Sequence, residues 1–191
     1  FIDLGVNQVR LTGGEPLLRR DLDLLVAQLA GLPHSPALAM TTNGTLLDAY
    51  AERLRRGGLS GVTISLDTLK ESRYFELTGR RELNAALRGI RRARDCSYDS
   101  LKLNMVVMRG FNCDELAPML HFAVNLGAEL RFIEYMDVGG ANRWRANDVV
   151  SAAEILEELT KQVGPIQPLG RPDAASPATR FALRDGTTFG I

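Results

Sequence analysis

Short β-rich runs alternate with amphipathic stretches along most of the chain, and this alternation restricts the fold more than any other feature of the sequence. Five runs are predicted as strands: Gln8–Thr12, Ala37–Thr42, Val62–Leu66, Leu101–Val107 and Leu130–Tyr135. Apolar residues recur at the spacing of one helix face in four stripes, which begin at Leu22, Leu47, Leu83 and Leu116. Strands that alternate with helices pair in parallel through crossover connections. We therefore predict an α/β fold.

The length of the chain excludes a complete closed barrel. Each strand–helix unit takes roughly 30 residues, so the chain holds about six units, whereas an eight-unit barrel needs roughly 250 residues. The remaining choices are a doubly wound open sheet and an incomplete barrel. A capping box of Ser151 and Glu154 begins a last helix, and after Gly164 a proline-rich loop and a hairpin at residues 181–191 replace the repeat. We expect a main domain over residues 1–163 and a C-terminal extension that begins at residue 164.

The charge and cysteine content exclude several classes of function. Lys and Arg number 23, as do Asp and Glu, so the net charge is zero and no global basic field attracts nucleic acid or an anionic membrane. No apolar run approaches the roughly 18 residues of a membrane span. Cys96 and Cys113 have no second Cys or His at the spacing of metal ligands. We therefore expect neither nucleic acid nor membrane as a partner, and no metal site within these residues.

Polar residues occur in strands that should be buried, where near-continuous apolar runs are usual. Period-two alternation places these polar residues on one face: Arg10 and Thr12, then Thr63, Ser65 and Asp67, then Lys102 and Asn104. Cations and hydroxyls that face a common interior are unfavourable unless something fills it. One explanation is that a polar, anionic ligand occupies this interior. The alternative is that the polar groups form hydrogen bonds and ion pairs with one another, with Lys102 paired to Asp67 or Glu134. We favour the ligand because the polar positions cluster toward the carboxyl ends of strands, where α/β folds bind ligands.

The segments that follow the strands agree with a ligand site. After the first strand, Gly13 and Gly14 permit close approach of the backbone, and Glu15 supplies a carboxylate. This arrangement suits a zwitterion, whose ammonium binds the carboxylate and whose carboxylate binds backbone N–H groups; the alternative is an ordinary turn ended by Pro16. Met136, after the fifth strand, is either a packing residue or a residue that packs on an adenine ring.

Six motifs, taken in order and spacing, resemble those of a known enzyme family. They are Val9–Pro16 (VRLTGGEP), Thr41–Gly44 (TTNG), Ser65–Asp67 (SLD), Thr78–Arg80 (TGR), Lys102–Asn112 (KLNMVVMRGFN) and Leu130–Met136 (LRFIEYM). The first three resemble radical S-adenosylmethionine (SAM) enzymes. All six together closely resemble the molybdenum-cofactor biosynthesis protein A family, the GTP 3′,8-cyclases.

This resemblance implies a fold, a reaction and cofactors. The family folds as an incomplete (β/α)6 TIM-like barrel, of which the first strand–helix unit is missing from this chain. It is a family of lyases that convert GTP to 3′,8-cyclo-7,8-dihydro-GTP in the first step of molybdenum cofactor biosynthesis. SAM and two [4Fe-4S] clusters are the implied cofactors. The implied partners are GTP, an external electron donor and a downstream cyclic pyranopterin synthase; the location is cytoplasmic, and the family also allows a homodimer.

The family's binding residues carry over to positions whose motifs match. For SAM they are Gly14, Glu15, Ser65 and Met136; for GTP they are Arg10, Thr41 and Lys102. Arg10 and Lys102 are also cations of the inward polar face, and a triphosphate explains the need for two. The resemblance assigns no catalytic residue and no metal ligand to this chain.

The chain also departs from the family pattern. The CxxxCxxC motif of the first cluster belongs before Phe1, and the CxxC motif and third Cys of the second cluster belong beyond Ile191; Cys96 and Cys113 match neither set. The chain also lacks an initiator Met, so we expect a fragment that is inactive alone. Two alternatives remain: another radical SAM enzyme that acts on a peptide or small molecule, and a non-catalytic barrel that has lost its clusters.

Overall fold

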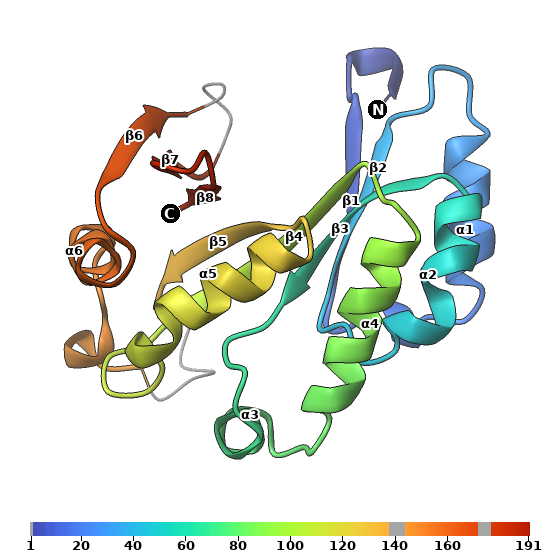
Figure 1. The fold of residues 1–191 in the computed structure, drawn as a ribbon. Helices are drawn as coiled ribbons and strands as arrows, with labels where there is room; N and C mark the ends of the chain where they lie inside the picture. Colours follow the sequence, from blue (N-terminus) through green and yellow to red (C-terminus); the bar gives the residue numbers. More distant parts are fainter. Residues whose placement is uncertain (1, 138–143, 172–176) are drawn as a thin grey trace. The chain divides into compact units, whose positions relative to one another are not determined.

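A computed structural model describes residues 2–137, 144–171 and 177–191 of the chain (Figure 1). The chain forms two compact units, which are described separately: unit 1 comprises Phe1–Ser65 and Gly79–Lys102, and unit 2 comprises Leu66–Thr78 and Leu103–Ile191. This division does not coincide with the boundary after residue 163 expected from the sequence, which stays a prediction.

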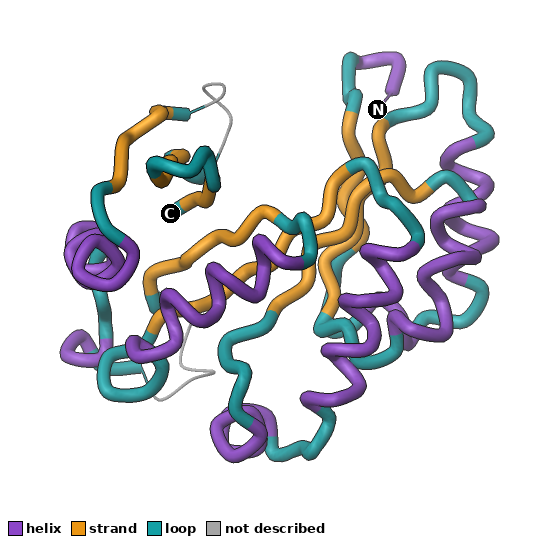
Figure 2. Tube along the Cα trace, viewed as in Figure 1, coloured by secondary structure: helices purple, strands orange, loops and turns teal. Residues whose placement is uncertain are grey.

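Unit 1 is a layer of parallel strands with helices on one side, as Figures 1 and 2 show. The strands lie in the order β1 (Gln8–Leu11), β2 (Ala37–Thr42), β3 (Leu59–Ser65). The helices are α1 (Leu22–Ala30), α2 (Leu47–Arg56) and α4 (Leu83–Asp95), with short 3₁₀ turns at Ile2–Leu4 and Pro16–Leu18. Each helix buries its apolar stripe, with Val26, Leu54 and Ile90 fully inaccessible. The crossover topology predicted from the alternation is therefore confirmed in this unit.

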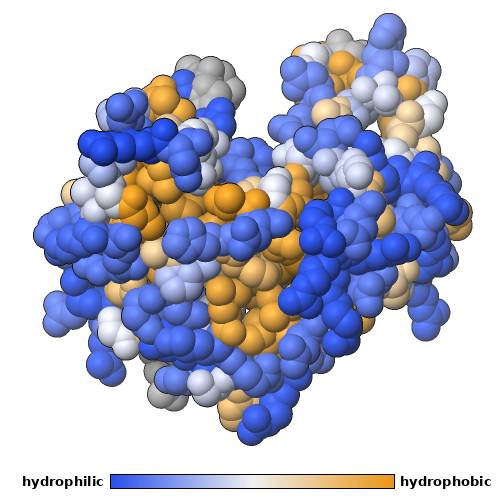
Figure 3. Space-filling model, viewed as in Figure 1, coloured by the Kyte–Doolittle hydropathy of each residue, from blue (hydrophilic) through white to orange (hydrophobic). Residues whose placement is uncertain are grey.

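Helices α2 and α4 pack closely, and their outer surface is charged. A Cβ atom on Gly89 would lie 2.2 Å from the carbonyl oxygen of Gly44, so only glycine fits at this crossing. Hydrophilic side chains dominate the surface over these helices in Figure 3. Arg92 of α4 pairs with Glu52 of α2 at 2.7 Å, and this half-exposed pair adds solubility and little stability.

Unit 2 contains the remaining strands in the order β4, β5, β8, β7, β6. Their bounds are β4 (Ser100–Val107, whose first three residues belong to unit 1), β5 (Glu129–Glu134), β6 (Ile166–Gly170), β7 (Arg180–Leu183) and β8 (Thr188–Gly190). Strand β8 runs parallel to β5, and β7 runs antiparallel to both β8 and β6. The helices are α3 (Glu71–Thr78), α5 (Leu116–Asn125) and α6 (Ala152–Val163), with 3₁₀ turns at Cys113–Glu115 and Ala146–Asp148.

The C-terminal hairpin of unit 2 is anchored by aromatic packing. The rings of Phe132 in β5 and Phe189 in β8 meet edge to face at 5.9 Å, and Phe181 in β7 stacks on Phe189 at 5.6 Å. Aromatic pairs of this geometry contribute beyond the area they bury. The predicted hairpin is therefore confirmed as β7 and β8, joined to the parallel strands through β5.

The structure corrects the sequence analysis in several places. Helix α3 was not predicted, and strands β1 and β5 end at Leu11 and Glu134 rather than at Thr12 and Tyr135. The proline-rich stretch after Gly164 was predicted as loop, yet Ile166–Gly170 forms the edge strand β6. Pro168 is tolerated there because one side of an edge strand has no partner strand, so that fewer of its backbone N–H groups are needed for hydrogen bonds. Strand β3 begins at Leu59 rather than Val62. The capping box is confirmed, since Ser151 Oγ accepts from the N–H of Glu154 and the Glu154 carboxylate accepts from that of Ser151.

Candidate functional site

Arg10 of β1 forms a polar row with Thr41 of β2 and Thr63 of β3. The parallel register pairs Thr41 with Thr63, and Arg10 Nη1 donates to the hydroxyl oxygen of each threonine at 3.2 Å. Arg10 is exposed, and within the described parts of the chain it makes no ion pair. Two neutral acceptors thus hold the guanidinium and leave its charge uncompensated. This row can bind an anion such as a phosphate.

The loop after β1 leaves space for a ligand at its two glycines. Gly13 has φ +148°, a conformation that residues with a side chain rarely adopt. A Cβ atom built on Gly13 or on Gly14 would meet no atom within 4 Å. The backbone of this turn is therefore open to close approach by a bound group, and its contact with a ligand stays a prediction.

The Glu15 carboxylate ties this loop to the carboxyl end of β2. Its Oε1 accepts from the Leu17 N–H at 3.0 Å and from the Thr42 hydroxyl at 2.7 Å, and its Oε2 accepts from the Asn43 N–H at 2.8 Å. Thr42 is buried, and its hydroxyl oxygen in turn accepts from the Gly44 N–H. Hydrogen bonds to a charged carboxylate are strong, so Glu15 fixes the position of the glycine turn. Its predicted contact with an ammonium group stays a prediction.

The other predicted site residues lie at strand ends in the two units. Ser65 is the last residue of β3; it is exposed, and its hydroxyl makes no hydrogen bond with the described residues. Lys102 is half-buried in β4. These two belong to unit 1, with Arg10 and the glycine turn. Met136 follows β5 in unit 2 and is 61% exposed, which suits a residue that packs on a ligand rather than in the core.

Unit 2 holds a cavity of about 590 Å³ at the end of β5. Its walls are Asn104, Arg131, Phe132, Ile133, Glu134, Met136, Ala152, Arg171, Pro177, Ala178, Thr179 and Ile191. Arg131 Nε donates to the Glu129 carboxylate at 2.7 Å, and Glu134 accepts from the N–H of Ala152, the first residue of α6, at 2.6 Å. The amino end of α6 therefore already has a carboxylate partner. The cavity combines an apolar surface with a few polar groups, the usual composition of a small-molecule site.

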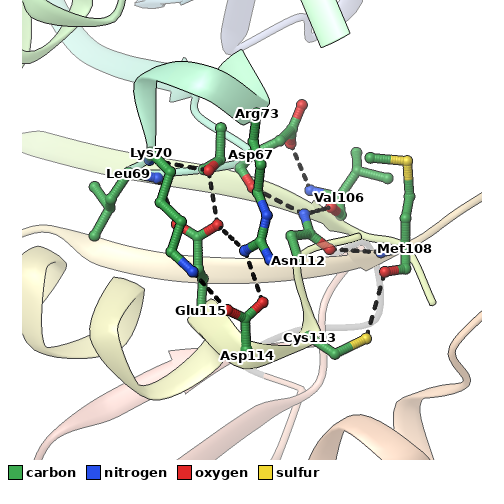
Figure 4. Close-up of polar contacts among 11 residues, drawn as sticks. Asp67, Leu69, Lys70, Arg73, Val106, Met108, Asn112, Cys113, Asp114 and Glu115 are labelled. Atoms are coloured by element: carbon green, nitrogen blue, oxygen red, sulfur yellow. Dashed lines mark hydrogen bonds and ion pairs between the residues drawn. The ribbon is translucent and has the colours of Figure 1, made fainter. Parts of the chain in front are cut away.

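The half-buried Asp67 and the buried Asn112 hold the segment that follows β3 (Figure 4). Asp67 Oδ1 accepts from the Val106 N–H at 2.7 Å, and Asn112 Nδ2 donates to the carbonyl oxygens of Asp67 and Val106, both at 2.8 Å. Burial raises the pKa of the Asp67 carboxyl from its usual 3.8 to about 6, and the hydrogen bond from Val106 partly opposes this rise. At the end of β4, hydrogen bonds from side chains thus replace the backbone hydrogen bonds of the sheet, and they define where the strand ends.

A second part of the same network contains a buried ion pair. Glu115 is 2% exposed, and its carboxylate accepts from the Thr68 hydroxyl and the Leu69 N–H, both at 2.7 Å, and pairs with Arg73 at 2.6 Å. Arg73 also pairs with Asp114 at 2.7 Å. Hydrogen bonds from Arg73 and Lys70 lower the pKa of the Asp114 carboxyl to about 2. This network stabilises the connection between β3 and α3, and its groups are satisfied by one another.

The described residues offer no place for a metal cluster. They contain no group of three or more His, Cys, Asp or Glu side chains that could hold a metal ion. Cys96 and Cys113 are both free thiols. The same residues include no helix with the length and apolar character that a membrane span needs.

Two residues of these sites were not assigned a role by sequence analysis. Thr63 completes the row around Arg10, and Asn104 lines the cavity of unit 2. Both were placed on the polar face by the period-two alternation, which was the signal that could have identified them. What the pattern could not provide was the partner of each group, because that depends on the strand register.

Comparison with protein-family models places most of the chain in one superfamily. Residues 1–123 match the model described as the radical SAM superfamily. Over 195 aligned residues the chain is 45% identical to GTP 3′,8-cyclase 3 of Mycobacterium bovis, covering 100% of this chain and 51% of that protein. It is 48% identical to GTP 3′,8-cyclase of Acidothermus cellulolyticus, covering 100% of this chain and 53% of that protein. The chain thus spans about half the length of the curated relatives it matches.

Solved structures agree on the fold. The crystal structure of Streptococcus suis SuiB aligns with this chain with a TM-score of 0.67 and a sequence identity of 19%. The alignment covers 82% of this chain and 36% of the SuiB chain. A second crystal structure of SuiB is bound to SAM. At this identity the likeness establishes the fold alone: an α/β, TIM-like partial barrel of the type that the sequence predicted.

Proposed function

The chain belongs to the radical SAM superfamily, and from this premise we propose that it is part of a GTP 3′,8-cyclase, a lyase that converts GTP to 3′,8-cyclo-7,8-dihydro-GTP. Relatives that bear this name are 40–48% identical over nearly the whole chain. The observation that carries the proposal is the row of Arg10, Thr41 and Thr63. It presents a cation without a carboxylate partner at the carboxyl ends of parallel strands.

In this proposal the triphosphate of GTP binds Arg10, Thr41 and Lys102. The guanidinium of Arg10 is held by two threonine hydroxyls, so binding needs little reorganisation of the side chain. Lys102 adds a second cation, which suits the several negative charges of a triphosphate. These residues bind and orient the substrate, and none of them is assigned a proton transfer.

SAM and an iron–sulfur cluster are the cofactors that membership of the superfamily implies. SAM fits unit 1, because the turn at Gly13 and Gly14 leaves room for its aminoacyl end and Glu15 holds that turn in place. Ser65 and Met136 supply further contacts, Met136 against the adenine. When bound, SAM serves this superfamily as the source of the radical that takes hydrogen from the substrate.

An iron–sulfur cluster does not fit the described residues, which provide no ligand set for a metal. The two [4Fe-4S] clusters that the family resemblance implies therefore need ligands other than the described residues. An external electron donor and a downstream cyclic pyranopterin synthase follow from the same resemblance, and so does a cytoplasmic location.

Isothermal titration of the intact protein with GTP tests the proposal without depending on turnover. Arg10→Gln should weaken GTP binding roughly 10- to 100-fold, because a charge-assisted contact is lost. Arg91→Gln is the matched control, since Arg91 lies exposed on α4 and the same charge is removed there. Equal affinities for wild type and Arg10→Gln would contradict the assignment. Binding of SAM but not of GTP by the wild type would favour another radical SAM substrate.

A further inference from the structure

The cavity in unit 2 is lined by a cation whose charge the described residues leave uncompensated. Arg171 directly follows β6, forms part of the wall of this cavity of about 590 Å³, and is exposed. It makes no hydrogen bond or ion pair with any residue that the structure describes. The other charged side chains of the wall have partners, since Arg131 pairs with Glu129 at 2.7 Å and Glu134 accepts from the Ala152 N–H at 2.6 Å. Within the described wall, Arg171 is thus the cation available to a bound anion.

The end of β6 determines where the Arg171 side chain can reach. Gly170, the last residue of β6, lies opposite Arg180 of β7 in the antiparallel pairing, so the strand stays paired up to the residue before Arg171. Gly170 has φ +77°, a left-handed conformation that glycine adopts far more readily than other residues. Thr179, which comes directly before β7, lines the same cavity. The pairing of β6 with β7 therefore brings Arg171 and Thr179 to one cavity.

The composition of the wall restricts the ligand that can bind there. A guanidinium presents N–H donors in a planar fork, which matches the oxygens of a phosphate or a carboxylate. Phe132, Ile133 and Met136 supply apolar surface in the same cavity, as is usual in small-molecule sites. A ligand that satisfies both features is an organic anion, with an apolar or planar part against these three residues and an anionic group at Arg171.

We propose that Arg171 binds a phosphate group of a nucleotide held in the cavity of unit 2. This assignment rests on the proposed function, which supplies two ligands with anionic groups, GTP and SAM. A triphosphate carries more negative charge than Arg10 and Lys102 neutralise, whereas the single carboxylate of SAM is proposed to bind at the glycine turn, so we favour the phosphate. Arg171 lies outside the six sequence motifs, and only the fold places it at the cavity.

Calorimetric titration of the intact protein with GTP tests this contact. Arg171→Gln should weaken GTP binding roughly 5- to 30-fold, because a charge-assisted hydrogen bond is lost at a position that water partly screens. Arg171→Lys keeps the charge without the planar fork and should lose less affinity. Arg184→Gln is the matched control and should bind GTP as the wild type does, since Arg184 is exposed directly after β7 and lies outside the cavity wall. Circular dichroism at rising temperature checks that each variant folds.

Titration with GDP, GMP and guanosine then identifies the group that Arg171 contacts. One phosphate should add less affinity in Arg171→Gln than in the wild type, while the affinity for guanosine stays equal in the two proteins. Normal GTP binding by Arg171→Gln, or an equal loss of affinity for GTP and for guanosine, would overturn the inference. A loss of SAM binding with GTP binding unchanged would overturn it too, and would assign the carboxylate of SAM to Arg171 instead. If the wild type binds no GTP, the proposed function itself fails and the inference falls with it, a result that differs from normal GTP binding by the variant.

Discussion

Asp67→Asn should make the protein more stable at pH 8, although it removes a charged residue from a hydrogen-bonded position. The Asp67 carboxyl has a pKa of about 6 in the folded chain against a usual 3.8, chiefly because burial disfavours the charged form. The difference corresponds to ~3 kcal/mol of unfavourable ionisation free energy, an upper value since the residue is partly exposed. Asparagine keeps an oxygen that can accept from the Val106 N–H and has no charge to bury.

The sign of the pH dependence follows from the direction of the shift. Between about pH 4 and pH 6 the folded state binds more protons at Asp67 than the unfolded state does. The contribution of Asp67 to stability therefore falls as the pH rises through this window and is constant above it. Asp67→Asn removes this dependence, so the variant and the wild type should converge near pH 4 and differ most above pH 7.

Urea denaturation followed by circular dichroism from pH 4 to pH 8 measures this effect. The control is Asp95→Asn, at the exposed end of α4, where a change within about 0.5 kcal/mol is expected at every pH. A lower stability of Asp67→Asn by the same amount at all pH values would refute the reasoning. It would mean that folding leaves the pKa of the Asp67 carboxyl unchanged, so that burial does not disfavour its charged form.

Two further predictions concern packing and the buried ion pair. Glu115→Ala should lower the free energy of unfolding by about 3–5 kcal/mol, because it leaves Arg73, the Thr68 hydroxyl and the Leu69 N–H without their carboxylate; an unchanged urea midpoint would contradict this. Gly89→Ala should cost about 1–3 kcal/mol, since its methyl group would overlap the Gly44 carbonyl oxygen, whereas Ala85→Gly on the same helix should cost only about 1 kcal/mol. Thermal melting of the two variants side by side checks the order, and equal melting temperatures would argue against a close approach at Gly89.

Most helices and parallel strands could be predicted because their signals are local. The stripe that begins at Leu47 becomes α2 (Leu47–Arg56), and the run Ala37–Thr42 is β2 without change. Periodicity in one segment was enough for both. Strand β6 was missed because Pro168 and the nearby prolines indicate a loop, and only pairing with β7, which is distant in sequence, makes the segment a strand.

The candidate site also contains residues that could be predicted from the sequence and contacts that could not. Arg10 could be selected from motif and alternation and Thr41 from its motif alone, and the structure brings them within hydrogen-bond distance. The partners of Glu15 could not be predicted, because Thr42 and Asn43 lie on another strand end and meet the carboxylate only through the fold. That Arg171 lines the cavity of unit 2 likewise becomes visible only when the fold is known.

The central claim is tested most directly by incubating the intact, anaerobically reconstituted protein with GTP, SAM and dithionite and analysing the products by mass spectrometry. The account predicts loss of GTP and formation of 3′,8-cyclo-7,8-dihydro-GTP, with SAM cleaved to methionine and 5′-deoxyadenosine. Cleavage of SAM while GTP remains unchanged would contradict it, and would indicate that the site acts on a different substrate.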